Sequence, residues 1–376
     1  MRIERPVAVL IMARELDQGG VERDVAKIAM HLDRSRFTPH VATYYAKGLR
    51  YEELRAAGIP ILDLPLRSLL SMEAVRSAMK LRRYIKEHGI RIVHSYDASG
   101  VFALPVARTA GVPVVIGSQL SYRTILDSRT QRLLRLSDHV ADVVLVNCEA
   151  IRRYMIEDEG VSPDRVEICY NGVVTAEFHS ANGRVRPEPL AGASLVIGTV
   201  CVLRPEKALL LLQEAFARVR HLEAGMKLLI VGSGPELPKL QENAARLGIG
   251  GATVFISATR DVAAWLRSMD IFVLPSYSEA FSNSLLEAMA CGCSVIGSRV
   301  GGTPELIGSN EERGFLFESG NTADLAAKLG RLIEDQALRC ELASRAARFV
   351  RENLTIEIAA QRTAAIYDEL LKRKLG

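Results

Sequence analysis

Short apolar runs alternate with amphipathic stretches along the first half of the chain. Residues 7–12 are continuously apolar and lead into a polar loop with glycines, and apolar positions in 21–32 then recur at helical spacing. This pair predicts a buried strand followed by a helix. The alternation continues, with strands expected at 41–45, 59–62, 92–94, 112–116 and 143–146, and helices at 72–87, 101–109 and 150–159. Buried strands that alternate with helices are typical of a parallel sheet covered on both faces.

A second alternation follows a stretch rich in glycine and proline. Strands are expected at 195–200, 228–231, 253–256, 271–274 and 294–296, and helices near 209–222, 237–247, 262–268 and 284–290. Alanine and leucine at three- and four-residue spacing predict helices from 322 to 375. We therefore predict an α/β protein with an N-terminal domain at 1–175, a linker at 176–193, a second domain at 194–354, and a last helix, 355–376, that packs back on the first domain.

Composition excludes several classes of protein. The 376 residues are 48% apolar and 24% charged, which is typical of a folded globular chain and not of a disordered or collagen-like one. No apolar run is long enough to span a membrane, and the first one is too short and too charged for a secretory signal, so we expect a cytoplasmic protein. The six cysteines and seven histidines are dispersed without metal-ligand spacing, so no metal is expected.

The formal net charge of +4 is unevenly distributed. Residues 1–175 hold 25 of the 48 basic residues and 21 of the 44 acidic ones, which leaves 23 of each in the remainder. Basic residues gather at 67–91 and again at 123–135. These helices could face anionic lipid headgroups at a membrane surface, and the alternative is a solvated helix face. No nucleic-acid partner is expected.

The most informative segment for chemistry follows the strand expected at 271–274. Glu279 and Glu287 lie eight residues apart, with Phe281, Ser282 and Asn283 between them at the expected start of a helix. Main-chain N–H groups at a helix start attract phosphate, and a carboxylate one turn further on can accept hydrogen bonds from two ribose hydroxyls. Glu279, just ahead of the loop, could hold a polar ligand such as a sugar. The alternative is a solvated helix residue and a turn residue.

The sequence around these residues resembles that of the family-four retaining glycosyltransferases of the GT-B type. The donor-site signature of that family is similar to 270–292, which reads DIFVLPSYSEAFSNSLLEAMACG, followed by VIGS at 295–298 and GGTPELI at 301–307. Further similar motifs are GGVE at 19–22, YNGV at 170–173, RPEK at 204–207 and GSGPE at 232–236. The resemblance implies two Rossmann-like, doubly wound parallel-sheet domains that face a central cleft.

The resemblance also implies roles for individual residues. The residue at Glu287 binds the nucleotide ribose, Glu279 lies beside the transferred sugar, and Lys207 is a cation for the donor diphosphate. Catalytic candidates are thus Glu279, Lys207 and Arg204. The donor-binding candidates are Gly19, Gly20, Gly232, Gly234, Val262, Phe281, Ser282, Asn283, Leu285 and Glu287.

The sequence departs from the family pattern at a few positions. Val202 stands where the family commonly has a phosphate-binding arginine, and Arg204 is the candidate replacement. Many relatives have a histidine where this chain has Gln119, so Gln119 and His94 are the acceptor-side candidates, with a purely structural histidine as the alternative for His94. The paired glycines at 19–20 are by themselves more often a simple turn.

The motifs together predict a retaining, metal-independent glycosyltransferase. It would move a sugar from a UDP- or GDP-sugar to a hydroxyl acceptor, in polysaccharide, lipid-linked saccharide or glycoconjugate synthesis. The nucleotide sugar is a co-substrate, so no cofactor is expected, and the acceptor is a sugar, a glycolipid or another hydroxyl compound. Two alternatives remain open, a nucleotide-sugar-binding relic of the same fold and a nucleotide-sugar epimerase. The motif at 232–236 does not fit a nicotinamide site, because Leu237 stands where the third glycine would be.

Overall fold

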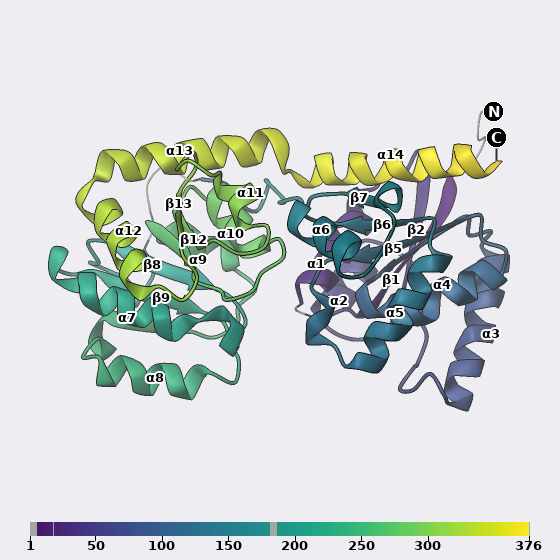
Figure 1. The fold of residues 1–376 in the computed structure, drawn as a ribbon, viewed down its shortest axis with the longest axis horizontal. Coiled ribbons are helices and arrows are strands. Elements are labelled where there is room, and N and C mark those ends of the chain that lie inside the picture. Colours follow the sequence, from purple (N-terminus) through teal and green to yellow (C-terminus); the bar gives the residue numbers. More distant parts are fainter. Residues whose placement is uncertain (1–5, 18, 181–185, 376) are drawn as a thin grey trace. The chain divides into compact units, whose positions relative to one another are not determined.

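The computed structural model describes residues 6–17, 19–180 and 186–375, which form two compact units. Unit 1 comprises 1–172 together with 356–376, and unit 2 comprises 173–355 (Figure 1). The described part of the predicted linker belongs to unit 2. Residues 181–185 of that linker, Gln18 of the first loop and both chain ends lie outside the described residues.

Unit 1 is built on a seven-stranded parallel sheet with the strand order β3-β2-β1-β4-β5-β6-β7. The order reverses direction between β1 and β4, which pair in register at Ile11 and His94. A reversal of this kind marks the switch point of a doubly wound sheet, and ligands bind beyond the carboxyl ends of strands there. The strands are β1 Val7–Glu15, β2 Phe37–Tyr45, β3 Ile61–Asp63, β4 Ile92–Tyr96, β5 Val114–Gln119, β6 Val143–Val146 and β7 Val166–Ile168.

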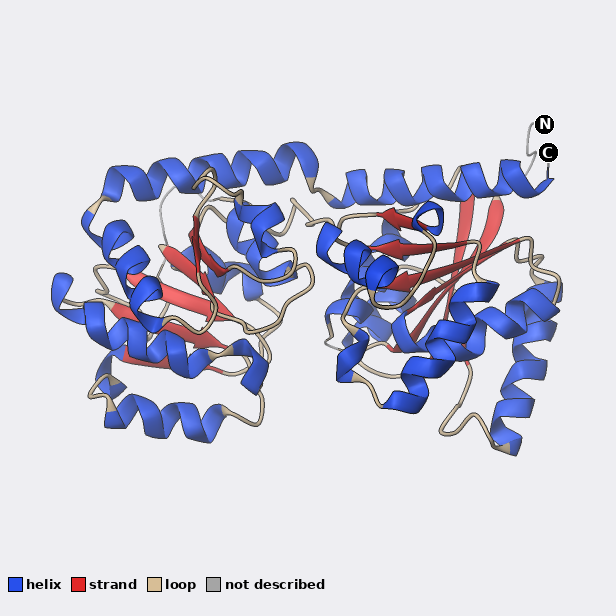
Figure 2. Cartoon of the chain, in the orientation of Figure 1, coloured by secondary structure: helices blue, strands red, loops and turns tan. Residues whose placement is uncertain are grey.

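Helices cover both faces of this sheet (Figure 2). Helix α3, for example, buries Ala74, Ser77, Leu81 and Ile85 along one face, as its spacing predicts. The last helix, α14, packs against α1 and β5, with Tyr367 fully buried. The helices of unit 1 are α1 Gly20–His31, α2 Leu49–Ala56, α3 Met72–Glu87, α4 Gly100–Thr109, α5 Ser128–Val140, α6 Glu149–Glu157 and α14 Ile356–Leu375, with 3-10 turns η1 Asp97–Ser99, η2 Arg123–Ile125 and η3 Pro163–Arg165.

Unit 2 has a six-stranded parallel sheet of order β10-β9-β8-β11-β12-β13, with its switch point between β8 and β11. Its core is a cluster of aliphatic and phenylalanine side chains from both the sheet and the helices. The strands are β8 Val196–Val200, β9 Lys227–Val231, β10 Thr253–Ile256, β11 Ile271–Leu274, β12 Ser294–Ser298 and β13 Phe315–Phe317. The helices are α7 Leu209–Val219, α8 Leu237–Arg246, α9 Val262–Ser268, α10 Asn283–Ala290, α11 Thr303–Ile307, α12 Thr322–Glu334 and α13 Gln336–Asn353, with 3-10 turns η4 Pro205–Lys207, η5 Arg220–Leu222 and η6 Gly250–Ala252.

The predicted fold class is confirmed, since each unit is a doubly wound parallel sheet with helices on its faces. Two edge strands, β7 and β13, and the helices α2 and α11 were not predicted. Across the described residues, every helix is too short or too polar to cross a membrane.

Candidate functional site

An ion pair joins the segments that follow the two central strands of unit 2. Strands β8 and β11 are parallel neighbours, so the chain leaves both at the same edge of the sheet. Lys207 ends the 3-10 turn after β8, and its Nζ lies 2.7 Å from Oε2 of Glu279, in the loop after β11. The Ser276 hydroxyl donates a hydrogen bond of 3.2 Å to the same carboxylate oxygen. Two predicted catalytic candidates, 72 residues apart in sequence, are thus brought together.

The surroundings keep Lys207 charged. Burial lowers the pKa of Lys207, the Glu279 carboxylate raises it, and the carboxylate prevails, so the pKa lies above its ordinary value. The loops that carry the pair are also joined through their main chains, because the N–H of Tyr277 donates a hydrogen bond of 2.8 Å to the carbonyl of Glu206. The ammonium of Lys207 is therefore held in place by the loop that leads into helix α10.

That helix, α10, begins directly after the Glu279 loop. Ser282 is its N-cap, with its hydroxyl oxygen accepting a hydrogen bond of 3.3 Å from the N–H of Leu285. Phe281 and Leu285 are buried in the unit, whereas Asn283 is partly exposed in the first turn. Glu287, one turn further along, is only 1% exposed. Buried glutamates are rare in protein interiors and usually serve a bound partner or a polar network.

Two glycines outside the loop fix the Glu279 segment from behind. Gly301 has φ of +51°, and a β carbon there would lie 1.7 Å from the carbonyl oxygen of Glu279. The N–H of Gly302 donates a 2.7 Å hydrogen bond to the carbonyl of Ala280. The matching motif included Gly301 and Gly302, but the spacing gave no hint that they support the Glu279 loop.

Gly232 and Gly234 similarly support the segment after β8. Gly232 has φ of +142°, and a β carbon there would lie 1.9 Å from the carbonyl oxygen of Cys201. A β carbon on Gly234 would lie 2.4 Å from the carbonyl oxygen of Leu203. Any larger residue at either position would displace the segment that leads to Lys207.

The remaining unit 2 candidates are less engaged. Arg204 is largely exposed, and its guanidinium reaches Glu206 at only 4.0 Å. Val202, at the position of the family arginine, is also exposed. Val262 is half-buried at the first position of α9, next to its N-cap Asp261.

In unit 1, the paired glycines lie at the start of α1 beside an acidic side chain. Gly19 is the N-cap and Gly20 the first helical residue. A β carbon on Gly19 would lie 1.7 Å from the Glu22 carboxylate, and burial raises the pKa of this glutamate. An anionic ligand at this helix start would have to displace the carboxylate of Glu22 or meet it protonated.

His94 is fully buried in the middle of β4, which runs two residues beyond the predicted strand, and both of its ring nitrogens are hydrogen-bonded. Nδ1 lies 2.7 Å from the hydroxyl of Tyr367 on α14, and Nε2 lies 2.7 Å from the hydroxyl of Ser118 on β5. Burial lowers the pKa of His94 to about 3, so the ring is neutral. In this arrangement both ring nitrogens serve contacts within unit 1, and a role toward the acceptor stays a prediction.

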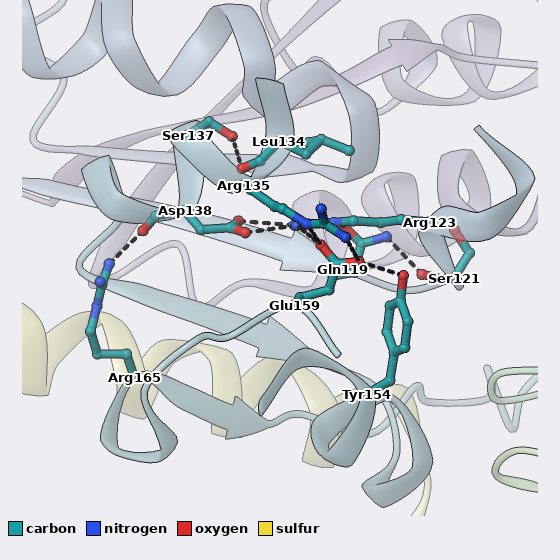
Figure 3. A network of polar contacts seen from close by, with 10 residues as sticks. All are labelled: Gln119, Ser121, Arg123, Leu134, Arg135, Ser137, Asp138, Tyr154, Glu159 and Arg165. Atoms are coloured by element: carbon teal, nitrogen blue, oxygen red, sulfur yellow. Dashed lines mark hydrogen bonds and ion pairs between the residues drawn. The ribbon is translucent and has the colours of Figure 1, made fainter. Parts of the chain in front are cut away.

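Gln119 ends β5 and belongs to a buried polar network (Figure 3). Its side-chain N–H donates to the carbonyl of Ser121 at 2.7 Å, and its oxygen accepts from Nε of Arg123 at 2.8 Å. Arg123 in turn forms a two-pronged ion pair with Asp138, at 2.7 and 2.9 Å, and reaches Glu159 at 3.0 Å. Sequence reasoning noted Arg123 only as part of a basic stretch, yet the side chain is 1% exposed.

No metal-binding cluster accompanies these residues. Within the ranges that the structure describes, three or more His, Cys, Asp or Glu side chains do not come together at any point. The polar groups of the candidate site are instead a lysine, two glutamates, hydroxyls and a helix start, which suit an anionic ligand with hydroxyl groups.

Comparison with known families and proteins agrees with this chemistry. A model described as Glycosyltransferase Family 4 matches residues 18–177, and one described as Glycosyl transferases group 1 matches 194–335. Among curated proteins, the chain is 37% identical over 164 residues to N-acetyl-alpha-D-glucosaminyl L-malate synthase of Bacillus anthracis, covering 43% of this chain and 42% of that protein. It is 29% identical over 401 residues to D-inositol 3-phosphate glycosyltransferase of Acidothermus cellulolyticus, covering 96% and 87%. The chain spans about half the length of the first curated relatives it matches.

Solved structures share the fold at low sequence identity. A glycosyltransferase from Rickettsia africae has a TM-score of 0.83 at 21% identity, covering 98% of this chain and 99% of that one. Anabaena HepE in complex with UDP has a TM-score of 0.83 at 20% identity, covering 96% and 100%.

Proposed function

We propose that this chain, which belongs to the family-four, group 1 glycosyltransferases, transfers a sugar from a nucleotide diphosphate sugar to a hydroxyl acceptor. The observation that carries the proposal is the meeting of Lys207 and Glu279 at 2.7 Å, beside the start of the helix that holds the buried Glu287. In such a donor, the cation and the helix start match the diphosphate, Glu279 matches the sugar, and the buried carboxylate of Glu287 matches the ribose.

Each group has a distinct task in this proposal. Glu287 accepts hydrogen bonds from the ribose hydroxyls, and the N–H groups at Ser282 and Asn283 face the diphosphate. Lys207 stabilises the negative charge that develops on the leaving diphosphate, with Arg204 as the exposed second cation. Glu279 orients the sugar and holds Lys207 in place, since the two are already bonded.

We favour retention at the anomeric carbon through substitution on one face of the sugar. Glu279 is committed to Lys207 and Ser276, so it is better placed to orient than to attack. The leaving diphosphate oxygen then takes the proton of the acceptor hydroxyl as the new glycosidic bond forms and the bond to the diphosphate breaks. Lys207 does the charge stabilisation for which other transferases use a metal, and full activity in EDTA is the corresponding expectation.

The donor is a UDP- or GDP-sugar, and UDP-sugars are the first to test. HepE has been crystallised in complex with UDP and with UDP-glucose, and it shares the fold of this chain. The acceptor hydroxyl belongs to a growing polysaccharide, a lipid-linked saccharide or another glycoconjugate.

Steady-state kinetics of three variants test the site. Glu287→Gln should raise the donor KM by roughly tenfold with little change in kcat, because the ribose contact is the same in the ground and transition states. Lys207→Ala and Glu279→Gln should also lower kcat, by roughly a hundredfold for Lys207. Glu341→Gln on α13, which removes an exposed carboxylate of unit 2, is the matched control and should behave as wild type. Near-normal kinetics in all three site variants would overturn the proposal.

A further inference from the structure

Exposed apolar side chains concentrate in one short stretch of unit 1. Of twelve large apolar side chains exposed among the described residues, five lie between 69 and 79. Leu70 is 82% exposed, Met72 67% and Met79 59%. Single exposed apolar side chains are normal on a protein surface. A group of five within eleven consecutive residues instead indicates a surface that binds a partner.

Helix α3 carries most of this group on the face opposite its packing face. Met72, Val75 and Met79 follow the spacing i, i+3, i+7, which places them in one row along the helix. The buried residues Ala74, Ser77, Leu81 and Ile85 lie on the other side, about half a turn away. The helix is therefore apolar on two faces, only one of which is used by the fold. Figure 1 shows α3 on the outside of unit 1. Leu69 and Leu70 lie in the turn directly before this helix.

The apolar row is bordered by positive charge. Arg76 and Arg83 lie along one side of the row at helical spacing. Arg82 lies along the other side and is followed there, one turn later, by Lys86. All four side chains are exposed. The two acidic residues of 67–87 are already engaged, since Glu73 accepts from the N–H of Arg67 at 3.0 Å and Glu87 pairs with Arg83 at 2.6 Å. Six basic residues against two acidic ones give this stretch a formal charge of +4, equal to that of the whole chain.

We propose that this face docks the chain onto an anionic phospholipid bilayer. The docking face consists of Leu69, Leu70, Met72, Val75, Met79, Arg76, Arg82, Arg83 and Lys86. An amphipathic surface helix with apolar residues in the middle and long basic side chains beside them can insert the former below the headgroups and pair the latter with lipid phosphates.

Charge complementarity favours a lipid surface over other anionic partners. A nucleic acid would pair with the arginines but would leave the apolar row of Met72, Val75 and Met79 against phosphates. A bilayer satisfies both kinds of side chain at once, because phosphate and acyl chain lie within a few ångströms of each other. The proposal does not depend on the transferase activity, since binding is measured without any sugar.

Vesicle co-sedimentation of the full chain tests the docking face. Wild type should bind vesicles of phosphatidylcholine with phosphatidylglycerol far better than phosphatidylcholine alone, and the difference should vanish at about 1 M salt, where the Debye length is about 3 Å. The triple change R76Q/R82Q/K86Q should weaken binding about a hundredfold, at roughly fivefold per basic residue. M72Q/V75Q/M79Q, which keeps good helix formers, should weaken it about tenfold or more.

A matched control separates this face from general charge. R218Q/R348Q/R351Q removes three exposed helix arginines of unit 2 and should bind like wild type. Equal losses in this control and in the unit 1 variants, or no binding of wild type to the anionic vesicles, would overturn the proposal. A further contradicting outcome is that R76Q/R82Q/K86Q loses the binding of wild type to single-stranded DNA but keeps its binding to vesicles. The basic residues of the docking face would then recognise phosphate without lipid.

Insertion of the apolar row is read by fluorescence. The single native tryptophan is first replaced by Trp265→Phe. In this background, the fluorescence emission of Leu70→Trp should shift to shorter wavelength on anionic vesicles and should be quenched by brominated lipid. Leu136→Trp, at another exposed leucine of unit 1 on α5, is the control and should stay unquenched. Equal quenching of both, or of neither, contradicts insertion through the docking face.

Discussion

Lys207 and Glu279 each make the burial of the other tolerable. An ammonium in a partly buried loop is destabilised by desolvation, which on its own lowers the pKa of Lys207. The carboxylate 2.7 Å away reverses this effect. The ion pair thus sets the protonation state of Lys207, so the charge on this partly buried ammonium depends on a neighbour that a single substitution can remove.

Glu279→Gln should shift the alkaline limb of the kcat/KM profile. With the carboxylate gone, burial remains, so the pKa of Lys207 falls and the active ammonium form is lost at lower pH. An adjacent opposite charge typically accounts for 1–3 pH units, so the limb should move down by at least about one unit. Glu206→Gln, which removes a more distant and half-exposed carboxylate, should shift it much less. Superimposable profiles for Glu279→Gln and wild type would show that Lys207 is not the group that titrates.

The two partners of this pair were predicted as site residues, but their contact was not. Each residue was identified from the sequence motif around it. Their contact depends on β8 and β11 being neighbours, an order set by the whole sheet of unit 2. Gln119 shows the same limit, because its partner Arg123 is fixed by Asp138 and Glu159, at 15 and 36 residues' distance.

At the scale of elements, the Arg123 network ties together three parts of unit 1 (Figure 3). Arg123 lies in the turn after β5, Asp138 lies on α5, and Glu159 follows α6. Burial raises the pKa of Asp138, and the Arg123 guanidinium opposes that rise. A buried guanidinium with two carboxylates is balanced only while all three are present, since removal of one leaves an uncompensated charge.

Arg123→Met should therefore destabilise the protein by about 3–5 kcal/mol at pH 7. This loss of unfolding free energy relative to wild type should become smaller as the pH is lowered to about 5. Without the guanidinium the folded-state pKa of Asp138 rises further above its unfolded value, so the folded variant takes up a proton and regains stability as pH falls through that pKa. Urea denaturation at both pH values measures this. Arg135→Met is the control, because Arg135 pairs with the same Glu159 from an exposed position and should cost no more than about 1 kcal/mol. Equal losses in the two variants would contradict the role of burial.

The elements that were not predicted have a common physical reason. β7 and β13 are three-residue strands at the outer edges of their sheets, too short to show a period in the sequence. Helix α2 buries only Leu54, so its apolar spacing is invisible. By contrast, the bounds of α3 were predicted from 72 to 87, because four buried positions recur at helical spacing. Strands too short to show a period, even when buried as β13 is, and helices with little burial leave no clear hydrophobic pattern in the sequence.

At the scale of the whole molecule, the proposed tasks are divided between the units. Glu279, Glu287 and Lys207 all come from unit 2, and the docking face comes from unit 1. Each unit has its own sheet and its own buried side chains, so a ligand that binds one should leave local opening in the other largely unchanged. Nucleotide binding and membrane docking are therefore separable by where each protects the backbone.

Hydrogen exchange with a panel of UDP, GDP, ADP and dTDP should show this division. The nucleotide that matches the donor should raise stability by about 2.7 kcal/mol at 100 times its Kd, and should slow exchange at 205–208 and 276–290 of unit 2. Helix α3 should exchange at the same rate with and without nucleotide, and should slow only on anionic vesicles. Because Val202 replaces the family arginine, the response also reports whether Lys207 and Arg204 suffice for the diphosphate. Protection confined to unit 1, or no response to any of the four nucleotides, would mean that the Lys207–Glu279 pair is a structural contact and that the donor site must be sought elsewhere.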